Sequence, residues 1–124
     1  MNDLSPAEMT WQFMLIAKAP TQLASNGGQM KAIFSDPSEV SWIRLLAKDG
    51  LIEIIDEQGL VGIQGLTAKG ALILNKAPDR VTWIKVIGPI IEAGDEISLK
   101  AIEERKWYRR AWAFIKALTP FLRS

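Results

Sequence analysis

The sequence predicts a mainly α-helical chain that contains one small β-hairpin. Two pairs of a serine or aspartate with a proline, at 5–6 and 36–37, are typical of helix starts. The polar side chain caps a backbone N–H, and proline suits the first helical turn. Two short β-branched runs, 51–55 and 60–63, are separated by the turn-forming segment 57–59. These features predict helices on both sides of a two-stranded ribbon.

The composition is that of a globular chain with little reactive side-chain chemistry. Of its 124 residues, 48% are hydrophobic and 23% are charged, which is sufficient for a core. The absence of cysteine and histidine excludes disulfides, thiolate metal sites and imidazole catalysis. We therefore expect no enzymatic activity, no metal and no cofactor. Among the tryptophans, Trp11, Trp42 and Trp83 lie at core-like positions.

Membrane insertion and secretion are not expected. No apolar run approaches the ~18–20 residues needed to cross a bilayer. The first residues lack the basic region of a signal peptide. These observations predict a cytoplasmic location and no membrane partner.

Three helices are expected before the hairpin. The first covers 6–19 and stops before Pro20, because proline cannot continue a helix. A second, short helix is expected over 28–34. A third is expected over 37–49, and Gly50 would then provide its left-handed C-cap.

Three more helices are expected after the hairpin, over 67–74, 79–94 and 98–118. Each begins at a threonine, aspartate or serine that can cap it. Gly88–Pro89 should kink or break the second of these helices, because proline removes one donor and clashes with the preceding turn.

Residues 6–75 resemble the winged helix-turn-helix superfamily, in which three helices, a two-stranded wing and a closing helix follow one another. The residues that carry this resemblance are Leu46, Gly50, Leu51, Ile52, Leu66, Thr67 and Gly70. We therefore expect a winged-helix domain over 1–76 and a helical extension over 77–124, which ends in a basic amphipathic helix.

Beyond the wing, the chain is similar to an uncharacterised family of small phage and prophage winged-helix proteins. The matching features are a tryptophan-bearing helix over 79–83, then Gly94, then a serine-capped start at 97–99. The resemblance implies a phage-derived protein without enzymatic activity, and it implies no ligand.

Nucleic-acid binding of a regulatory kind is the leading function that the sequence predicts. In winged helices the third helix usually enters the major groove of DNA. Side chains of that helix, one lysine of the second helix and the basic arc of the last helix are therefore candidate contacts. The candidate nucleic-acid-binding residues are Lys31, Ser38, Ser41, Arg44, Lys48, Arg105, Lys106, Arg109 and Arg110.

The charge pattern argues against DNA binding through the third helix. Segment 36–57 holds two basic and six acidic residues, whereas DNA affinity depends largely on phosphate neutralisation. A solvated helix face without a ligand is the simplest interpretation of Ser38, Ser41, Arg44 and Lys48. The alternative function is a protein-interaction module, such as an inhibitor or adaptor, on the same scaffold.

The last predicted helix, 99–118, has one apolar and one basic arc. Residues 99–124 contain seven basic and two acidic residues. The basic arc could follow nucleic-acid phosphates, or the helix could lie in a membrane interface. Packing of the apolar arc on the domain or on a second copy is favoured, which predicts a homodimer. The predicted interface residues are Trp107, Ala111, Phe114, Ile115 and Leu118.

Overall fold

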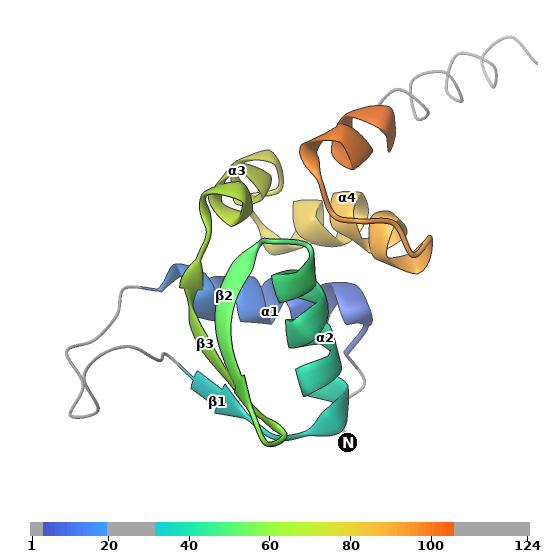
Figure 1. Cartoon of the computed structure of the whole chain (residues 1–124). Helices are drawn as coiled ribbons and strands as arrows, with labels where there is room; N and C mark the ends of the chain where they lie inside the picture. Colours follow the sequence, from blue (N-terminus) through green and yellow to red (C-terminus); the bar gives the residue numbers. More distant parts are fainter. Residues whose placement is uncertain (1–3, 20–31, 106–124) are drawn as a thin grey trace, which may run out of the picture.

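A computed structural model describes residues 4–19 and 32–105 of the chain (Figure 1). Its elements are α1 (Pro6–Lys18), β1 (Ala32–Phe34), α2 (Pro37–Lys48), β2 (Ile52–Glu57), β3 (Leu60–Leu66), α3 (Ala68–Lys76) and α4 (Arg80–Glu92). Residues 99–105 are the described part of one more helix. The three strands form an antiparallel sheet in the order β1-β3-β2. The chain is therefore mainly helical with a small sheet, as predicted.

Local signals in the sequence begin and end most of these elements. Backbone N–H groups three residues later are capped by the side chains of Ser5, Asp36, Thr67, Asp79 and Ser98. Gly50 follows α2 with a φ of 81°, and Gly94 follows α4 with a φ of 73°. The hairpin turn places Gln58 and Gly59 at positive φ, which suits a two-residue turn. The hairpin and the helix starts predicted near 6, 37, 67, 79 and 98 are therefore confirmed.

Residues 32–34 form a strand and not the end of the short helix that was predicted over 28–34. β1 pairs with β3, so that Ile33 lies opposite Gly62. The ring of Phe34 packs edge-on against Phe13 of α1, with ring centroids 5.3 Å apart. A short isolated helix is marginal in water, whereas the strand gains both pairing and burial. Residues 28–31 lie outside the described part of the chain.

Helix α4 continues through Gly88–Pro89, where the sequence predicted a kink or a break. Residues 80–92 are helical without interruption, although Pro89 lacks the N–H that an interior position donates. Ile87 and Ile90 on either side are fully buried. A Cβ at Gly88 would lie 3.4 Å from the Cβ of Ala7, so the two helices approach closely here. Packing on α1 offsets the loss of one backbone bond.

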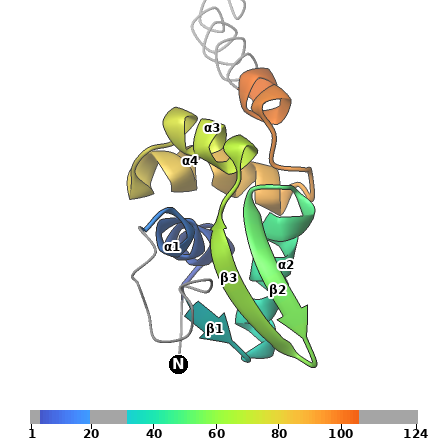
Figure 2. The ribbon, with the colours of Figure 1, turned by 60° about the vertical axis from the view of Figure 1, so that its left-hand side comes forward.

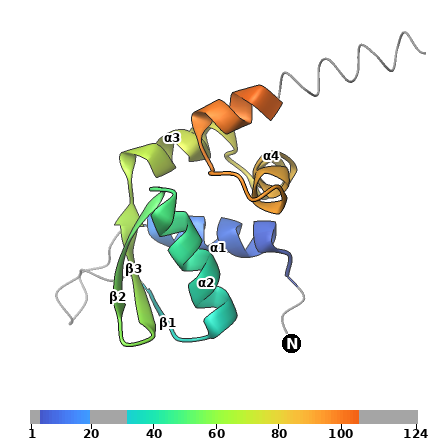
Figure 3. The same ribbon diagram turned by 45° about the vertical axis from the view of Figure 1, so that its right-hand side comes forward.

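Helix α1 lies at the centre of the described chain, in contact with α2, β3 and α4 (Figure 3). The fully buried Trp83 of α4 donates its indole N–H to Thr10 Oγ1 at 3.0 Å. Its ring lies 5.8 Å from the ring of Trp11. Trp42 is only half-buried. Ile97 and Ile102 join the same core, so residues 77–105 share one core with the residues before them.

The start of α3 lies directly against the end of α2. Thr67 Oγ1 donates to the carbonyl of Gly50 at 2.5 Å, and the Thr67 N–H donates to the carbonyl of Leu51 at 3.0 Å. One turn later, a Cβ at Gly70 would lie 2.1 Å from the carbonyl oxygen of Leu51. Only glycine fits at this position without moving the backbone.

We expect Gly70→Ala to lower the free energy of unfolding by about 3 kcal/mol or more, because the new methyl group overlaps a backbone carbonyl. Urea denaturation followed by tryptophan fluorescence measures this loss. Gly65→Ala is the matched control, since nothing lies within 4 Å of the Cβ position of Gly65. Equal stability losses in the two variants would contradict the proposed contact.

Candidate nucleic-acid interface

The exposed side of α2 carries four of the residues predicted to contact nucleic acid. Val40, Ile43 and Leu46 face the core, and this burial turns the opposite side of the helix outward. The exposed residues on that opposite side are Ser38, Ser41, Arg44 and Lys48. Together with Asp56 of β2, which contacts Arg44, these four residues form what we call the α2 face.

Arg44 is bound to the hairpin. Its Nε donates to Asp56 Oδ2 at 2.8 Å, and its second terminal nitrogen donates to Asp56 Oδ1 at 3.0 Å. This bidentate fork is the geometry with which an arginine would contact the O6 and N7 of a guanine. Arg44 must therefore leave Asp56 before it can contact a base in this way.

The charge of each partner is stabilised by the other. The hydrogen bond from Arg44 lowers the pKa of Asp56. The same bond raises the pKa of Arg44. The side chains are 49% and 39% exposed, so salt screens the attraction between them. The pair fixes the position of the guanidinium more than it stabilises the fold.

The N-terminal end of the α2 face is also internally bonded. Ser38 Oγ donates to Asp36 Oδ2 at 2.6 Å, and Asp36 caps the helix by accepting the N–H of Glu39. Both hydrogen bonds lower the pKa of Asp36, and the bond from the Ser38 hydroxyl contributes more than the bond from the Glu39 N–H. Among the described residues of the α2 face, Ser41 and Lys48 are left without such a bond.

A shallow groove runs beside the α2 face, between the first half of α2 and the hairpin turn. Its lining residues are Ser35, Pro37, Val40, Ser41, Arg44 and Gly59. The groove places Ser41 next to the fixed guanidinium of Arg44. It can therefore receive one side chain or a short segment of a partner.

The remaining predicted contacts lie elsewhere. Arg105 forms an ion pair with Asp95, N to O 3.4 Å, in the loop after α4, and not with the hairpin that holds Arg44. Outside the described residues lie Lys31, Lys106, Arg109 and Arg110, together with the predicted interface residues Trp107, Ala111, Phe114, Ile115 and Leu118.

Asp49, at the C-terminal end of α2, has a structural role that the sequence analysis missed. Its side chain is buried, and Oδ2 accepts the N–H of Ile97 at 3.1 Å. Lys69 Nζ donates to its carbonyl at 2.6 Å. Of the six acidic residues in segment 36–57, one is therefore used inside the fold. The sequence contains one indication of this buried role, because Asp49 directly precedes the C-cap glycine Gly50, where the chain turns inward.

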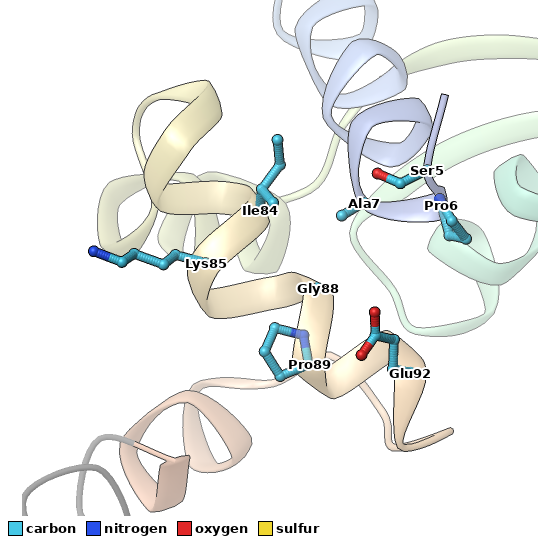
Figure 4. A pocket seen from close by; sticks show the side chains of 8 residues that line it. All are labelled: Ser5, Pro6, Ala7, Ile84, Lys85, Gly88, Pro89 and Glu92. Carbon is cyan, nitrogen blue, oxygen red and sulfur yellow. The ribbon is translucent and has the colours of Figure 1, made fainter. Parts of the chain in front are cut away.

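A second cavity lies between the start of α1 and α4 (Figure 4). The side chain of Glu92 points toward α1, whereas that of Lys85 points away from it. Ser5, on the opposite wall, already accepts the N–H of Glu8 as the cap of α1. The cavity therefore combines a carboxylate with a hydroxyl that is already in use, and we assign no ligand to it.

We expect Arg44→Gln to raise the pKa of Asp56 toward its ordinary value, because the main cause of its depression is removed. Carbon-detected NMR titration of the aspartate side chains measures this shift. The control is Asp79, whose pKa is lowered mainly by the N–H of Thr82 and should stay unchanged.

The sign of the effect on stability follows from the same shift. A carboxyl whose pKa is lowered by folding stabilises the native state above its ordinary pKa, about 3.9, and loses that contribution as the pH falls through the native value. The wild-type protein should therefore lose more stability between pH 5 and pH 2 than Arg44→Gln. An unchanged Asp56 titration in the variant would contradict the ion pair.

Residues 4–19 and 32–105 hold no group of three or more acidic side chains that could bind a metal ion. In the same two stretches, no helix is long and apolar enough to cross a membrane. No family model, curated protein or solved structure matches the chain.

Proposed function

We propose that this chain is a protein-interaction module on a winged-helix-like scaffold, and that its α2 face binds a basic segment of another protein. The observation that carries the proposal is the bidentate pairing of Arg44 with Asp56. This pairing removes the best candidate for base recognition. Among the described residues of the α2 face, Lys48 is then the one cation that forms no ion pair.

Charge supports a basic partner. Without the buried Asp49, segment 36–57 contributes Asp36, Glu39, Glu53, Asp56 and Glu57 against Arg44 and Lys48. These residues do not all lie on the α2 face, since Glu53 and Glu57 alternate with Asp56 and point to the side of Ile55. A polyanion would nevertheless meet only two cations in this segment, whereas DNA-binding proteins commonly neutralise several phosphates. A lysine- or arginine-rich segment would be attracted to the acidic side chains of this segment, and it would bind faster at low salt.

The element order supports the same function. A helix-turn-helix places a second helix directly before the recognition helix, and that second helix crosses the DNA backbone. Here, the described residues directly before α2 are those of β1, which belongs to the sheet. The scaffold resembles a winged helix in its sheet order and hairpin, but within residues 32–105 no helix precedes α2 along the chain.

Nucleic-acid binding of a regulatory kind is the second candidate. It is favoured by the exposure of Ser41 and Lys48 on one side of a helix of 12 residues. It requires Arg44 to exchange Asp56 for a base or a phosphate. The two candidates therefore differ in what they predict when Asp56 is neutralised.

We expect Asp56→Asn, which frees Arg44, to change the affinity for a labelled random-sequence duplex by less than twofold. We expect the same of Arg44→Gln/Lys48→Gln. Fluorescence anisotropy of the full chain at 50 and 200 mM salt measures both, and any binding common to all variants comes from residues outside the α2 face. If Asp56→Asn tightens binding about tenfold and Arg44→Gln/Lys48→Gln abolishes it, nucleic-acid binding replaces our proposal.

We further expect peptides selected against the full chain from a random display library to be rich in lysine and arginine. Ser41→Arg, which adds a bulky cation to the groove, should abolish their binding. Gln12→Arg, which adds the same residue on the exposed side of α1, should not. Selected peptides without basic residues, or equal peptide binding by Ser41→Arg and Gln12→Arg, would contradict the proposed function.

A further inference from the structure

The outer side of the sheet, opposite the core, carries an apolar patch. Val61 and Ile63 point into the core and are fully buried. Because side chains alternate along a strand, the residues between and beside them point outward. Ile33 is 57% exposed and Leu60 is 51% exposed, while Ile55 is half-buried. We call Ile33, Ile55 and Leu60 the outer patch; Figure 2 shows this side of the sheet, with α2 behind the strands.

The strand register makes the patch concave. Gly62 of β3 lies opposite Ile33 of β1 on one side and opposite Ile55 of β2 on the other. The central strand therefore contributes no side chain between the two isoleucines. Ile33, Ile55, Leu60 and Gly62 line one groove together with Glu57 and Gln58. A large apolar side chain of a partner fits such a gap.

The charged residues of the hairpin around the patch all have one sign. The hairpin, residues 52–66, contains Glu53, Asp56 and Glu57 and no lysine or arginine. Glu53 and Glu57 are exposed and alternate to the same side as Ile55, whereas Asp56 is paired with Arg44 of α2. An apolar groove with acidic neighbours favours an occupant that combines large apolar side chains with cations.

The chain itself contains such a segment. Residues 106–124 hold five basic residues and no acidic residue. They also hold five aromatic residues, Trp107, Tyr108, Trp112, Phe114 and Phe121. Both the apolar groove and the charge around it are complementary to this composition.

We propose that the outer patch receives residues 106–124 of a second copy of this chain, so that two copies exchange their C-terminal segments in a symmetric dimer. The described helix 99–105 ends at the opposite end of the molecule from the hairpin turn (Figures 1 and 3). Residue 105, to which the segment is joined, therefore lies far from the outer patch of its own copy. This interface goes beyond the proposed function and lies on a different surface.

Sedimentation velocity of the full chain over a range of concentrations tests the proposal. We expect the wild-type protein to dimerise at micromolar concentration. Ile33→Asp and Leu60→Asp should each weaken the dimer about tenfold or more, because a carboxylate would be buried in the contact. Val81→Asp is the matched control, since Val81 is 65% exposed on α4, outside the outer patch. The dimer affinity of this variant should equal that of the wild-type protein. Circular dichroism confirms that each variant is folded.

A charge exchange tests the identity of the occupant. Glu53→Lys/Glu57→Lys should weaken the dimer, and Arg109→Glu/Arg110→Glu should do the same. Combining the four substitutions should restore much of the affinity, because the attraction is rebuilt with opposite signs. Any of three results would overturn the proposal. The wild-type protein could be monomeric, its dimer affinity could be unchanged by Ile33→Asp and Leu60→Asp, or the combined variant could fail to recover affinity. None of these outcomes depends on whether the α2 face binds basic peptides.

Discussion

The close approach of Gly70 to the carbonyl of Leu51 is the constraint on which the arrangement of the other elements depends. A Cβ at position 70 would lie 2.1 Å from that oxygen, so α3 can start here only because the residue is glycine. Thr67 bonds the same junction through the carbonyls of Gly50 and Leu51. These contacts tie the end of α2, the base of the hairpin and the start of α3 together. The buried carboxylate of Asp49 extends the junction to the chain after α4, because it accepts the N–H of Ile97.

Helix α1 packs against elements that lie far apart in the described chain, among them β3 and α4. The hydrogen bond from Trp83 to Thr10 joins residues 73 positions apart, and it is buried. Gly88 allows α4 to lie close to Ala7. Since Ile97 and Ile102 also belong to this core, the position from which residues 106–124 depart is held by the fold. A segment that begins at a fixed point can reach the same place on every neighbouring copy, which is what an exchange between two copies requires.

The features that could be predicted from the sequence are those set by residues close together in the chain. The caps at Ser5, Thr67 and Asp79, and the glycine turns, act within three or four residues and were recognised. The strand at 32–34 was missed because it depends on β3, almost thirty residues later. The continuity of α4 through Pro89 depends on packing against α1. Arg44 was recognised as exposed, but its partner Asp56 comes from the hairpin, and only the packing of α2 beside β2 brings the two charges together.

The two surfaces differ in chemistry and lie on opposite sides of the hairpin. The α2 face is polar, and its guanidinium is held in place by a carboxylate of β2. The outer patch is apolar, and its depth comes from a glycine between two isoleucines. Because side chains alternate along the strands, one hairpin can present Asp56 to α2 and Ile55 to the opposite side without conflict.

A dimer formed through the outer patch therefore leaves both α2 faces uncovered. In the proposed dimer, two identical faces would bind a partner with two basic segments more tightly than a single face would, since the second contact would form within the same complex. Weak individual charge contacts, as expected for exposed pairs, are then sufficient for a stable interaction.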